Sequence, residues 1–505
     1  MPGHPPRQLP TFAAALMALL AGALAVAGFA PLGYWPLTFL SLAVLFGVWM
    51  HTRSIRAAFF IGLVWGWGFF LTGVSWIYVS LSVYGGMSMG LSALATFLFC
   101  TVLALLPALA GALQASVRVS PGARLTLAMP LFWGVTEWMR GWLFTGFPWL
   151  ATGYSQVPAS PLAGYAPLIG VYGVSFLLAL MAALLVWGVV SRGRTARRVW
   201  AAAAMLAIGV GGQALRAVEW TTADGAPTSV ALLQGNIPQH LKWQPDSMRS
   251  TLEIYARLAA ASPAQLIVLP ETALPLFESD LPDFYRQGLE TLGRKNGGDI
   301  LTGLPTGSPD AAYYNSVISL GSAPSQRYSK SHLVPFGEYI PLKPLWGWVI
   351  AVLRIPLSDF ARGATDQRPL VIGGQRVAAN ICYEDAFGEE IIRQLPQASV
   401  LVNVSNLAWF GDSLAPWQHA QMSQMRALET GRMMLRATNT GLTAIIDRKG
   451  RLMASLPPFT TGSLAGTLQG YAGSTPYVRW GNTPILIVWT LLGVAVVGIG
   501  VRRPL

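Results

Sequence analysis

Three polar residues, each placed directly after a β-rich apolar run, form the most reactive combination of side chains in this sequence. Glu271 follows LIVLP, Lys330 lies in YSKSHLVPFGEYIP just after another such run, and Cys382 follows VAANI. A thiol is a weak nucleophile until a base takes its proton or a cation favours the thiolate. Glu271 can act as that base and Lys330 as that cation, so this set is suited to nucleophilic acyl chemistry on Cys382.

Each of the three residues also has an ordinary structural explanation when taken alone. A carboxylate after a strand often caps a loop, a lysine is usually solvated, and a free cysteine is usually a small buried hydrophobe. The chain has only two cysteines, so a disulfide framework and a thiolate zinc site are both excluded. His332 and His419 would allow a Cys–His pair, but Glu271 already fills the role of base, which favours packing or hydrogen bonding for both histidines.

The elements that must position these residues lie in a polar stretch that begins near residue 228. Short β-rich runs alternate there with helical stretches such as 248–262 and 419–432, a pattern that predicts an α/β layered domain. Reactive groups in such domains gather just past the ends of strands. The sequence contains no zinc motif, phosphate-binding glycine loop, GxSxG elbow or dinucleotide fingerprint in a suitable context, so we expect no metal and no cofactor.

The rest of the chain is apolar enough to predict a membrane protein. Hydrophobic residues make up 53% of the sequence and charged residues only 11%. A helix that spans a membrane needs about 20 mostly apolar residues. Eight runs of suitable length occur, at 11–30, 34–50, 57–80, 86–113, 126–146, 167–190, 198–217 and 483–501. We therefore expect seven transmembrane helices in 1–217, a soluble domain in 218–482, and an eighth transmembrane helix followed by a short tail in 483–505.

The distribution of arginine predicts the orientation of these helices. Arginines gather in alternate short loops, and the connections 80–86 and 147–166 contain neither lysine nor arginine. Because basic loops stay in the cytoplasm, both termini should be cytoplasmic, and in a bacterium the soluble domain should face the periplasm. The first run also resembles a signal peptide, although its length favours an uncleaved anchor. The same topology explains the net charge of +12 without a nucleic-acid partner.

Two further features suggest a function, one in the predicted membrane part and one in the soluble domain. Glu137 and Arg140 stand three residues apart at the edge of a predicted span, where they either form an ion pair that steadies a loop or contact a substrate. The run LWGWVIAVL at 345–353 is too short to span a bilayer. It is expected to form an arm that dips into the outer leaflet, with a buried helix of the soluble domain as the alternative.

Several long motifs resemble known families. The order Glu271, Lys330, Cys382 is similar to that of the nitrilase superfamily of carbon–nitrogen hydrolases. More closely, QGNIPQHLKW, LPETALP, YSKSHLVPFGEYIPL, ICYEDAF, the long segment 405–432 and RATNTG resemble the apolipoprotein N-acyltransferase family. The resemblance covers essentially the whole chain, and Leu407 is its one visible departure, at a position where an acidic residue is expected. It implies eight spans plus a periplasmic αββα sandwich.

The resemblance also implies a reaction and a set of site residues. An acyl chain would pass from a phospholipid to Cys382 as a thioester, and then to the N-terminal amine of a diacylglyceryl-cysteine apolipoprotein at the bacterial inner membrane. Glu271 would be the base and Lys330 the oxyanion stabiliser, while Glu338, Tyr383, Glu384 and Trp243 would support the site or bind substrate. Glu338 could instead be a structural loop carboxylate, and Trp243 a packed aromatic residue. The alternative function is a membrane-anchored amidase of the periplasm, which would use the same three residues.

Overall fold

The computed structural model describes residues 11–52, 54–191, 193–308, 310–340 and 359–501, which divide into two units. The first unit comprises Met1–Ser75, Ala93–Val218 and Trp480–Leu505, and the second comprises Trp76–Ser92 and Glu219–Arg479. The run 345–353, expected to form an apolar arm, lies outside the described residues.

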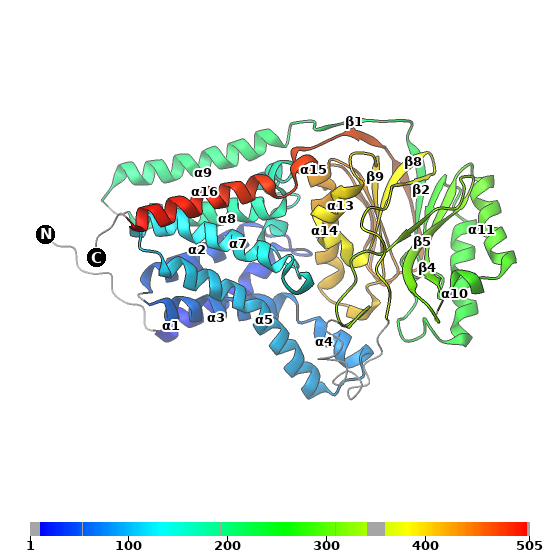
Figure 1. The fold of residues 1–505 in the computed structure, drawn as a ribbon, viewed down its shortest axis with the longest axis horizontal. Coiled ribbons are helices and arrows are strands. Elements are labelled where there is room, and N and C mark those ends of the chain that lie inside the picture. The colour runs from blue at the N-terminus through cyan, green and yellow to red at the C-terminus, as the bar shows by residue number, and fades with distance from the viewer. Residues whose placement is uncertain (1–10, 53, 192, 309, 341–358, 502–505) are drawn as a thin grey trace. The chain divides into compact units, whose positions relative to one another are not determined.

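Long apolar helices build the first unit (Figure 1). They are α1 (Thr11–Ala25), α2 (Pro36–His51), α3 (Ile55–Gly73), α5 (Met89–Ser116), α7 (Met129–Arg140), α8 (Ala166–Val190), α9 (Thr195–Leu215) and α16 (Thr483–Val501). Among the described residues, six helical segments are long and apolar enough to cross a membrane. These six coincide with predicted spans, whereas the predicted spans 34–50 and 126–146 correspond to the shorter helices α2 and α7.

Helix α7 is short because its helical stretch changes geometry along its length. A single turn, α6 (Pro121–Ala123), leads into a π-helical segment at Arg124–Ala128 before α7 begins. At the other end, Glu137 and Arg140 are buried and lie 3.6 Å apart. Glu137 accepts hydrogen bonds from the backbone N–H of Thr152 at 3.0 Å and from its hydroxyl at 3.0 Å, and Arg140 donates to the carbonyl of Phe147 at 3.2 Å. Glu137 and Arg140 therefore form an ion pair that holds the 147–152 loop against the end of α7, as the first of the two interpretations expected.

A connection between two apolar helices belongs to the second unit. The segment Trp76–Ser92 follows α3 and contains the short helix α4 (Ile77–Val79). The indole N–H of Trp76 donates to the side-chain carbonyl of Gln418 at 3.1 Å, and the Trp76 ring packs against Phe410 at 4.6 Å between centroids. The helix predicted to run through residue 80 therefore ends at Gly73, and Trp76, which follows, packs within the second unit.

Two six-stranded sheets form the centre of the second unit. The first sheet has the order β13-β2-β3-β4-β5-β6 and the second β12-β11-β10-β9-β8-β7, while β1 (Thr221–Ala223) and β14 (Tyr471–Gly473) pair separately. The strands of the first sheet are β2 (Thr228–Gln234), β3 (Leu266–Val268), β4 (Asp299–Gly307), β5 (Tyr313–Gly321), β6 (Arg327–Ser329) and β13 (Gly462–Leu468). Those of the second are β7 (Leu370–Ile372), β8 (Gln375–Ile381), β9 (Val400–Ser405), β10 (Met434–Thr438), β11 (Thr443–Ile446) and β12 (Leu452–Leu456).

The sheets pack face to face, with helices on both outer faces (Figure 1). Alternate residues of each strand point to opposite faces, so Val377, Ala379 and Ile381 of β8 enter the core between the sheets while Ala378 packs outward. Helices α10 (Pro245–Ala260) and α11 (Asp283–Lys295) cover the first sheet, and α13 (Gly388–Ile391) and α14 (Ala415–Thr430) cover the second. This confirms the predicted αββα sandwich.

Candidate active site

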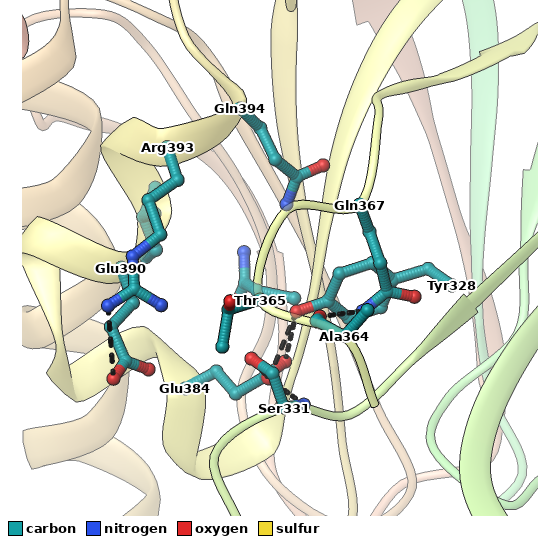
Figure 2. Close-up of a pocket in the computed structure, with 11 residues that line it drawn as sticks. Tyr328, Ser331, Ala364, Thr365, Gln367, Glu384, Glu390, Arg393 and Gln394 are labelled. Atoms are coloured by element: carbon teal, nitrogen blue, oxygen red, sulfur yellow. Dashed lines mark hydrogen bonds and ion pairs between the residues drawn. The ribbon is translucent and has the colours of Figure 1, made fainter. Parts of the chain in front are cut away.

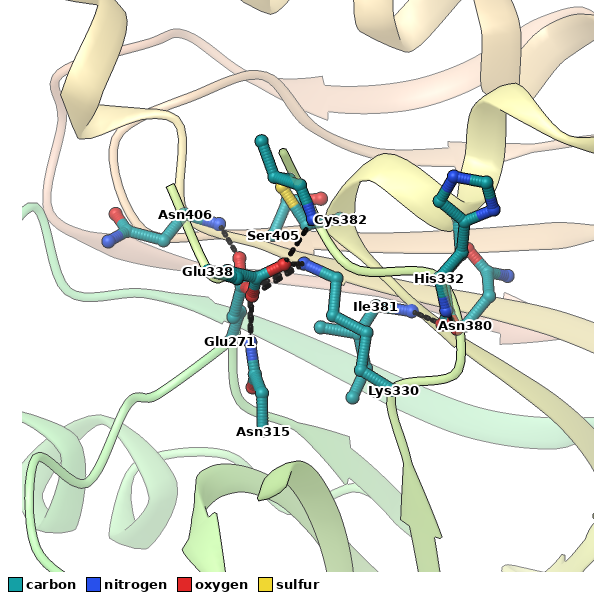
Figure 3. Close-up of polar contacts among 12 residues, drawn as sticks. Glu271, Asn315, Lys330, His332, Glu338, Asn380, Ile381, Cys382, Ser405 and Asn406 are labelled. Carbon is teal, nitrogen blue, oxygen red and sulfur yellow. Dashed lines mark hydrogen bonds and ion pairs between the residues drawn. The ribbon is translucent and has the colours of Figure 1, made fainter. Parts of the chain in front are cut away.

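The ends of three strands bring the predicted catalytic residues to one place (Figure 3). Glu271 lies just past β3, Lys330 directly follows β6, and Cys382 directly follows β8. The first two strands belong to one sheet and the third to the other, so the site lies where the two sheets of the sandwich meet. Strands β3 and β8 contribute buried Leu, Ile and Val side chains to the core, and β6 contributes the buried Tyr328, which fixes the direction in which the following residues leave the core.

Glu271 and Lys330 form the ionic centre of the site. The ammonium of Lys330 lies 3.4 Å from Glu271 Oε1, and it donates to Glu338 Oε1 at 2.9 Å. The amide of Asn315 bridges the two carboxylates, at 2.7 Å from Glu271 and 2.9 Å from Glu338. The second oxygen of Glu271 accepts from the backbone N–H of Asn406 at 2.7 Å. Glu271 is therefore held from both sides, in one orientation.

The charge balance of this cluster keeps Lys330 ionised. Burial disfavours its ammonium, but the carboxylates of Glu338 and Glu271 more than offset that effect and raise the pKa of Lys330 above its ordinary value. Only 1% of the lysine side chain is exposed. A fixed and desolvated cation of this kind stabilises negative charge on a neighbouring atom far better than a solvated lysine does.

Cys382 has an unusual backbone and a protonated thiol. Its φ of +53° lies in the left-handed region, which a residue with a side chain seldom adopts and which is typical of functional turns. Burial and the negative charge of Glu271 raise the pKa of the thiol to about 12, against an opposing effect of Lys330. The resting thiol is thus neutral, and its proton must be removed during the reaction.

Glu384 ties the turn that carries Cys382 to the loop that carries Lys330. Figure 2 shows Glu384 beside Ser331 and Tyr328. Its Oε1 accepts from the backbone N–H groups of Ser331 at 2.6 Å and His332 at 3.1 Å, while Oε2 accepts from that of Ile381 at 2.7 Å. The hydroxyl of Tyr328 donates to both oxygens at 3.0 Å. Because Ile381 precedes Cys382 and Ser331 follows Lys330, one carboxylate fixes the spacing of the nucleophile and the cation.

The remaining predicted site residues take different positions. Tyr383 is buried beside His332 and Phe387 in an aromatic cluster. Trp243 is 52% exposed, and in the described part of the chain no hydrogen bond joins its side chain to Glu271, Lys330 or Cys382. His332 stacks on Phe387 and contacts Glu390 at 3.2 Å, which agrees with a packing and hydrogen-bonding role.

Several residues of the site were not predicted from the sequence. Asn315 and Asn406 hold Glu271, and the buried ammonium of Lys242 donates to the carbonyl of Glu271 at 3.2 Å. Burial lowers the pKa of Lys242 to about 8, although Glu271 and Cys382 oppose that shift. Gly303 of β4 leaves no room for a side chain, because a Cβ there would lie 2.9 Å from the Cα of Glu271 and 2.5 Å from the nitrogen of Thr272. For Asn315 and Asn406, the sequence signal that could have indicated a role in the site was an asparagine near the end of an apolar strand.

Comparisons with known proteins place the chain in a family. Residues 21–184 match the family model described as the apolipoprotein N-acyltransferase N-terminal domain, and residues 229–477 match the carbon-nitrogen hydrolase model. The apolipoprotein N-acyltransferase of Nitrosomonas europaea is 51% identical over 95% of this chain and 95% of its own. That of Chromobacterium violaceum is 46% identical over 97% of this chain and 94% of its own.

The chain belongs to the apolipoprotein N-acyltransferase family. The resemblance found in the sequence motifs is therefore confirmed, and membership of this family favours acyl transfer over the amidase alternative. A solved amidase from Nesterenkonia sp. is 17% identical over 52% of this chain and 95% of its own, with a TM-score of 0.35. Among the described residues, no group of three or more His, Cys, Asp or Glu side chains is arranged to hold a metal ion.

Proposed function

We propose that this chain transfers an acyl group from a phospholipid to the N-terminal amine of a diacylglyceryl-cysteine apolipoprotein, through a thioester on Cys382. Membership of the apolipoprotein N-acyltransferase family supports the reaction. The observation that carries the mechanism is the meeting of Glu271, Lys330 and Cys382 at the ends of three strands.

The first half-reaction forms the thioester. Glu271 takes the proton of the Cys382 thiol as the sulfur attacks the ester carbonyl carbon of the phospholipid. Negative charge develops on the carbonyl oxygen, and the ammonium of Lys330 stabilises it most strongly in the transition state. When the intermediate collapses, the carbon–oxygen bond of the ester breaks, and Glu271 returns its proton to the leaving alkoxide. A lysophospholipid departs, and the acyl chain stays on sulfur.

The second half-reaction uses the same groups in the reverse sense. The amine of the apolipoprotein attacks the thioester carbon while Glu271 accepts a proton from its nitrogen. The carbon–sulfur bond then breaks, an amide forms, and Glu271 restores the thiol proton. Because the base is neutralised and regenerated within each half, the cycle neither gains nor loses a proton.

Glu338 and Glu384 support this cycle without touching the reacting atoms. Glu338 holds the ammonium of Lys330 at 2.9 Å and also accepts from the backbone N–H of Val334 at 2.8 Å. Glu384 fixes the Lys330 loop against the Cys382 turn. For Tyr383 and Trp243 we propose a part in shaping the substrate entrance, because Tyr383 adjoins the nucleophile and Trp243 follows Lys242, which contacts the Glu271 backbone.

For the topology we propose an inner-membrane protein with both termini in the cytoplasm. Residues 1–217 and 483–505 would form the transmembrane part, and 218–482 the periplasmic catalytic domain. The alternating arginine content of the short loops supports this orientation. A reporter enzyme that works only in the periplasm, fused after Thr222, should be active. An inactive fusion there, with an active one after Gln114, would reverse the orientation.

The reaction is tested by following a labelled acyl chain with the purified full-length protein. With phospholipid donor and a diacylglyceryl-cysteine peptide, the label should appear on the peptide amine, with one lysophospholipid released for each amide formed. Cys382→Ala should abolish both products. Release of the label as free fatty acid, or hydrolysis of small amides with no transfer to the peptide, would instead support the amidase alternative.

A further inference from the structure

The left-handed backbone of Cys382 needs an explanation, because nothing in its own side chain favours it. A non-glycine residue at φ +53° is held there only when its surroundings determine the conformation. The carbonyl oxygen of Cys382 provides the point of attachment. It accepts hydrogen bonds from His419 Nε2 at 3.1 Å and from Asn403 Nδ2 at 3.2 Å.

These two donors come from different layers of the sandwich. Asn403 pairs in register with Asn380 of β8 on one side and with Arg436 of β10 on the other. This row lies two residues beyond Ala378, Leu401 and Met434, which pack outward, so it faces the same way. His419 belongs to α14, the helix that covers this face. The row of Asn380, Asn403 and Arg436 therefore faces the helix that carries the buried His419, next to the Cys382 carbonyl.

The direction of the hydrogen bond from His419 is fixed by Arg436. Arg436 Nη2 lies 2.9 Å from His419 Nδ1, and a guanidinium can only donate. Nδ1 is therefore the acceptor, the ring proton lies on Nε2, and Nε2 donates to the carbonyl of Cys382. Burial and the positive charge of Arg436 lower the pKa of His419 well below its ordinary value, so the ring stays neutral. Asp385 Oδ2, 3.9 Å from Nε2, is itself paired with Arg436.

The amide of Asn403 is oriented by the same arginine. Arg436 Nη1 donates to Asn403 Oδ1 at 2.9 Å, and the hydroxyl of Ser405 donates to the same oxygen at 2.6 Å. The amide nitrogen must then point the other way, where it donates to Asn380 Oδ1 at 2.6 Å and to the carbonyl of Cys382. One guanidinium thus directs both donors at one carbonyl.

We propose that His419 and Asn403, oriented by Arg436, are positioning residues that hold the Cys382 carbonyl and so keep the nucleophile in its left-handed conformation. The inference rests on the proposed role of Cys382 as the nucleophile. It assigns no proton transfer to His419, because its proton is committed to the carbonyl and its second nitrogen accepts from Arg436. The position of the thiol thus depends on two neutral donors that contact the Cys382 carbonyl.

Two substitutions of His419 test the hydrogen bonds of its two ring nitrogens separately. The amide of Gln extends to the position of Nε2, so His419→Gln keeps a donor for the Cys382 carbonyl. The amide of Asn reaches only the position of Nδ1, so His419→Asn keeps a partner for Arg436 and loses the carbonyl donor. On Asn403, Asn403→Asp keeps the shape and the pairing with Arg436 but places an acceptor opposite the carbonyl.

The measurements are kcat and KM for acyl transfer by the full-length protein in detergent, the rate of iodoacetamide reaction with Cys382, and the thermal unfolding midpoint. We expect His419→Asn and Asn403→Asp to lower kcat about tenfold or more, with KM nearly unchanged. His419→Gln should recover most of that loss. The matched control is Gln424→Met, which removes a buried hydrogen bond from α14 to the Gly450 carbonyl. It should lower the unfolding midpoint and leave kcat within twofold.

Two outcomes overturn the inference. One is a wild-type kcat and alkylation rate in His419→Asn and Asn403→Asp, and the other is a His419→Gln variant no more active than His419→Asn at an equal unfolding midpoint. Cys382→Ala distinguishes these failures from failure of the proposed function. If Cys382→Ala still transfers acyl groups, the nucleophile assignment is wrong. If it is inactive while the His419 and Asn403 variants behave as wild type, only the positioning role is wrong.

Discussion

Replacing Glu384 with glutamine tests whether one carboxylate sets the distance between nucleophile and cation. The Glu384 side chain is buried, and its two oxygens accept from three backbone N–H groups and two hydroxyls. A glutamine amide has only one oxygen. Whichever way it turns, its NH₂ group faces either the N–H of Ile381 or the N–H groups of Ser331 and His332. The less costly orientation leaves the N–H of Ile381 without an acceptor.

The size of the effect follows from these bonds. An unpaired buried N–H costs about 1–3 kcal/mol, and hydrogen bonds to a charged acceptor are stronger than those to a neutral one by about 1 kcal/mol. Burial raises the pKa of Glu384 despite its backbone donors, so removal of the charge returns part of this cost. We therefore expect Glu384→Gln to destabilise the folded protein by about 2–4 kcal/mol.

The assay combines unfolding with Cys382 chemistry. Glu384→Gln should lower the unfolding midpoint, and in the protein that stays folded it should lower kcat for acyl transfer at least about tenfold, because Lys330 and Cys382 lose their common anchor. The matched control is Glu390→Gln, whose partly exposed carboxylate contacts His332 Nδ1 at 3.2 Å. Its effect should stay below about 1 kcal/mol. Equal stability and kcat in the wild type and Glu384→Gln would show that Glu384 does not hold the Cys382 turn against the Lys330 loop.

Three further substitutions test separate parts of the site. Glu271→Gln should abolish acyl transfer yet move the pH midpoint of Cys382 alkylation below about 12, because the negative charge of Glu271 raises that pKa; an unchanged midpoint would contradict the coupling. Gly303→Ala should displace the Glu271 turn, because a Cβ there would lie 2.9 Å from the Glu271 Cα. It should lower kcat at least about tenfold. Wild-type kinetics would show that β4 moves to admit the methyl group without displacing Glu271. Lys242 has a folded-state pKa of about 8 against an ordinary 10.5, so the unfolded chain binds more protons between these values and stability should rise with pH there; Lys242→Met should remove that rise, and an identical pH dependence would contradict the burial effect.

The sequence predicts that Glu271, Lys330 and Cys382 follow strand ends, because strand periodicity and strand ends are local signals. Runs of Val, Ile and Leu mark the buried strands, and the residue that follows each run must leave the core. Cys382 follows VAANI, and the structure ends β8 at Ile381. The two layers of helices follow from the same periodicity, since both faces of each sheet are apolar and need cover.

The support of the site was not predictable by the same means. The contacts of Glu384 with Ser331 and His332 cross more than 50 positions of sequence, and only the folded sandwich brings these segments together. Asn380, Asn403 and Arg436 interrupt apolar strands, but the register that makes them neighbours is a tertiary property. Their unusual polarity within buried strands was nevertheless a visible signal.

The membrane part shows a different limit. The sequence predicts eight spans, whereas six helical segments of the described residues are long and apolar enough to cross a membrane. Helix α7 is shorter and contains the buried pair of Glu137 and Arg140. The cost of these charges is offset by their mutual contact and by hydrogen bonds to the 147–152 loop. Composition alone predicts neither this compensation nor the change of helix geometry at Arg124–Ala128 that shortens α7.

The most direct test of the proposed chemistry is the mass of the enzyme after reaction with phospholipid alone. Without an acceptor amine, the first half-reaction should stop at the thioester. Intact-protein mass spectrometry, followed by peptide mapping, should find one long-chain acyl group on Cys382, removable by hydroxylamine and absent from Cys382→Ala. Addition of a diacylglyceryl-cysteine peptide should discharge it into an amide. An unmodified Cys382 under conditions that support full turnover would contradict the thioester mechanism.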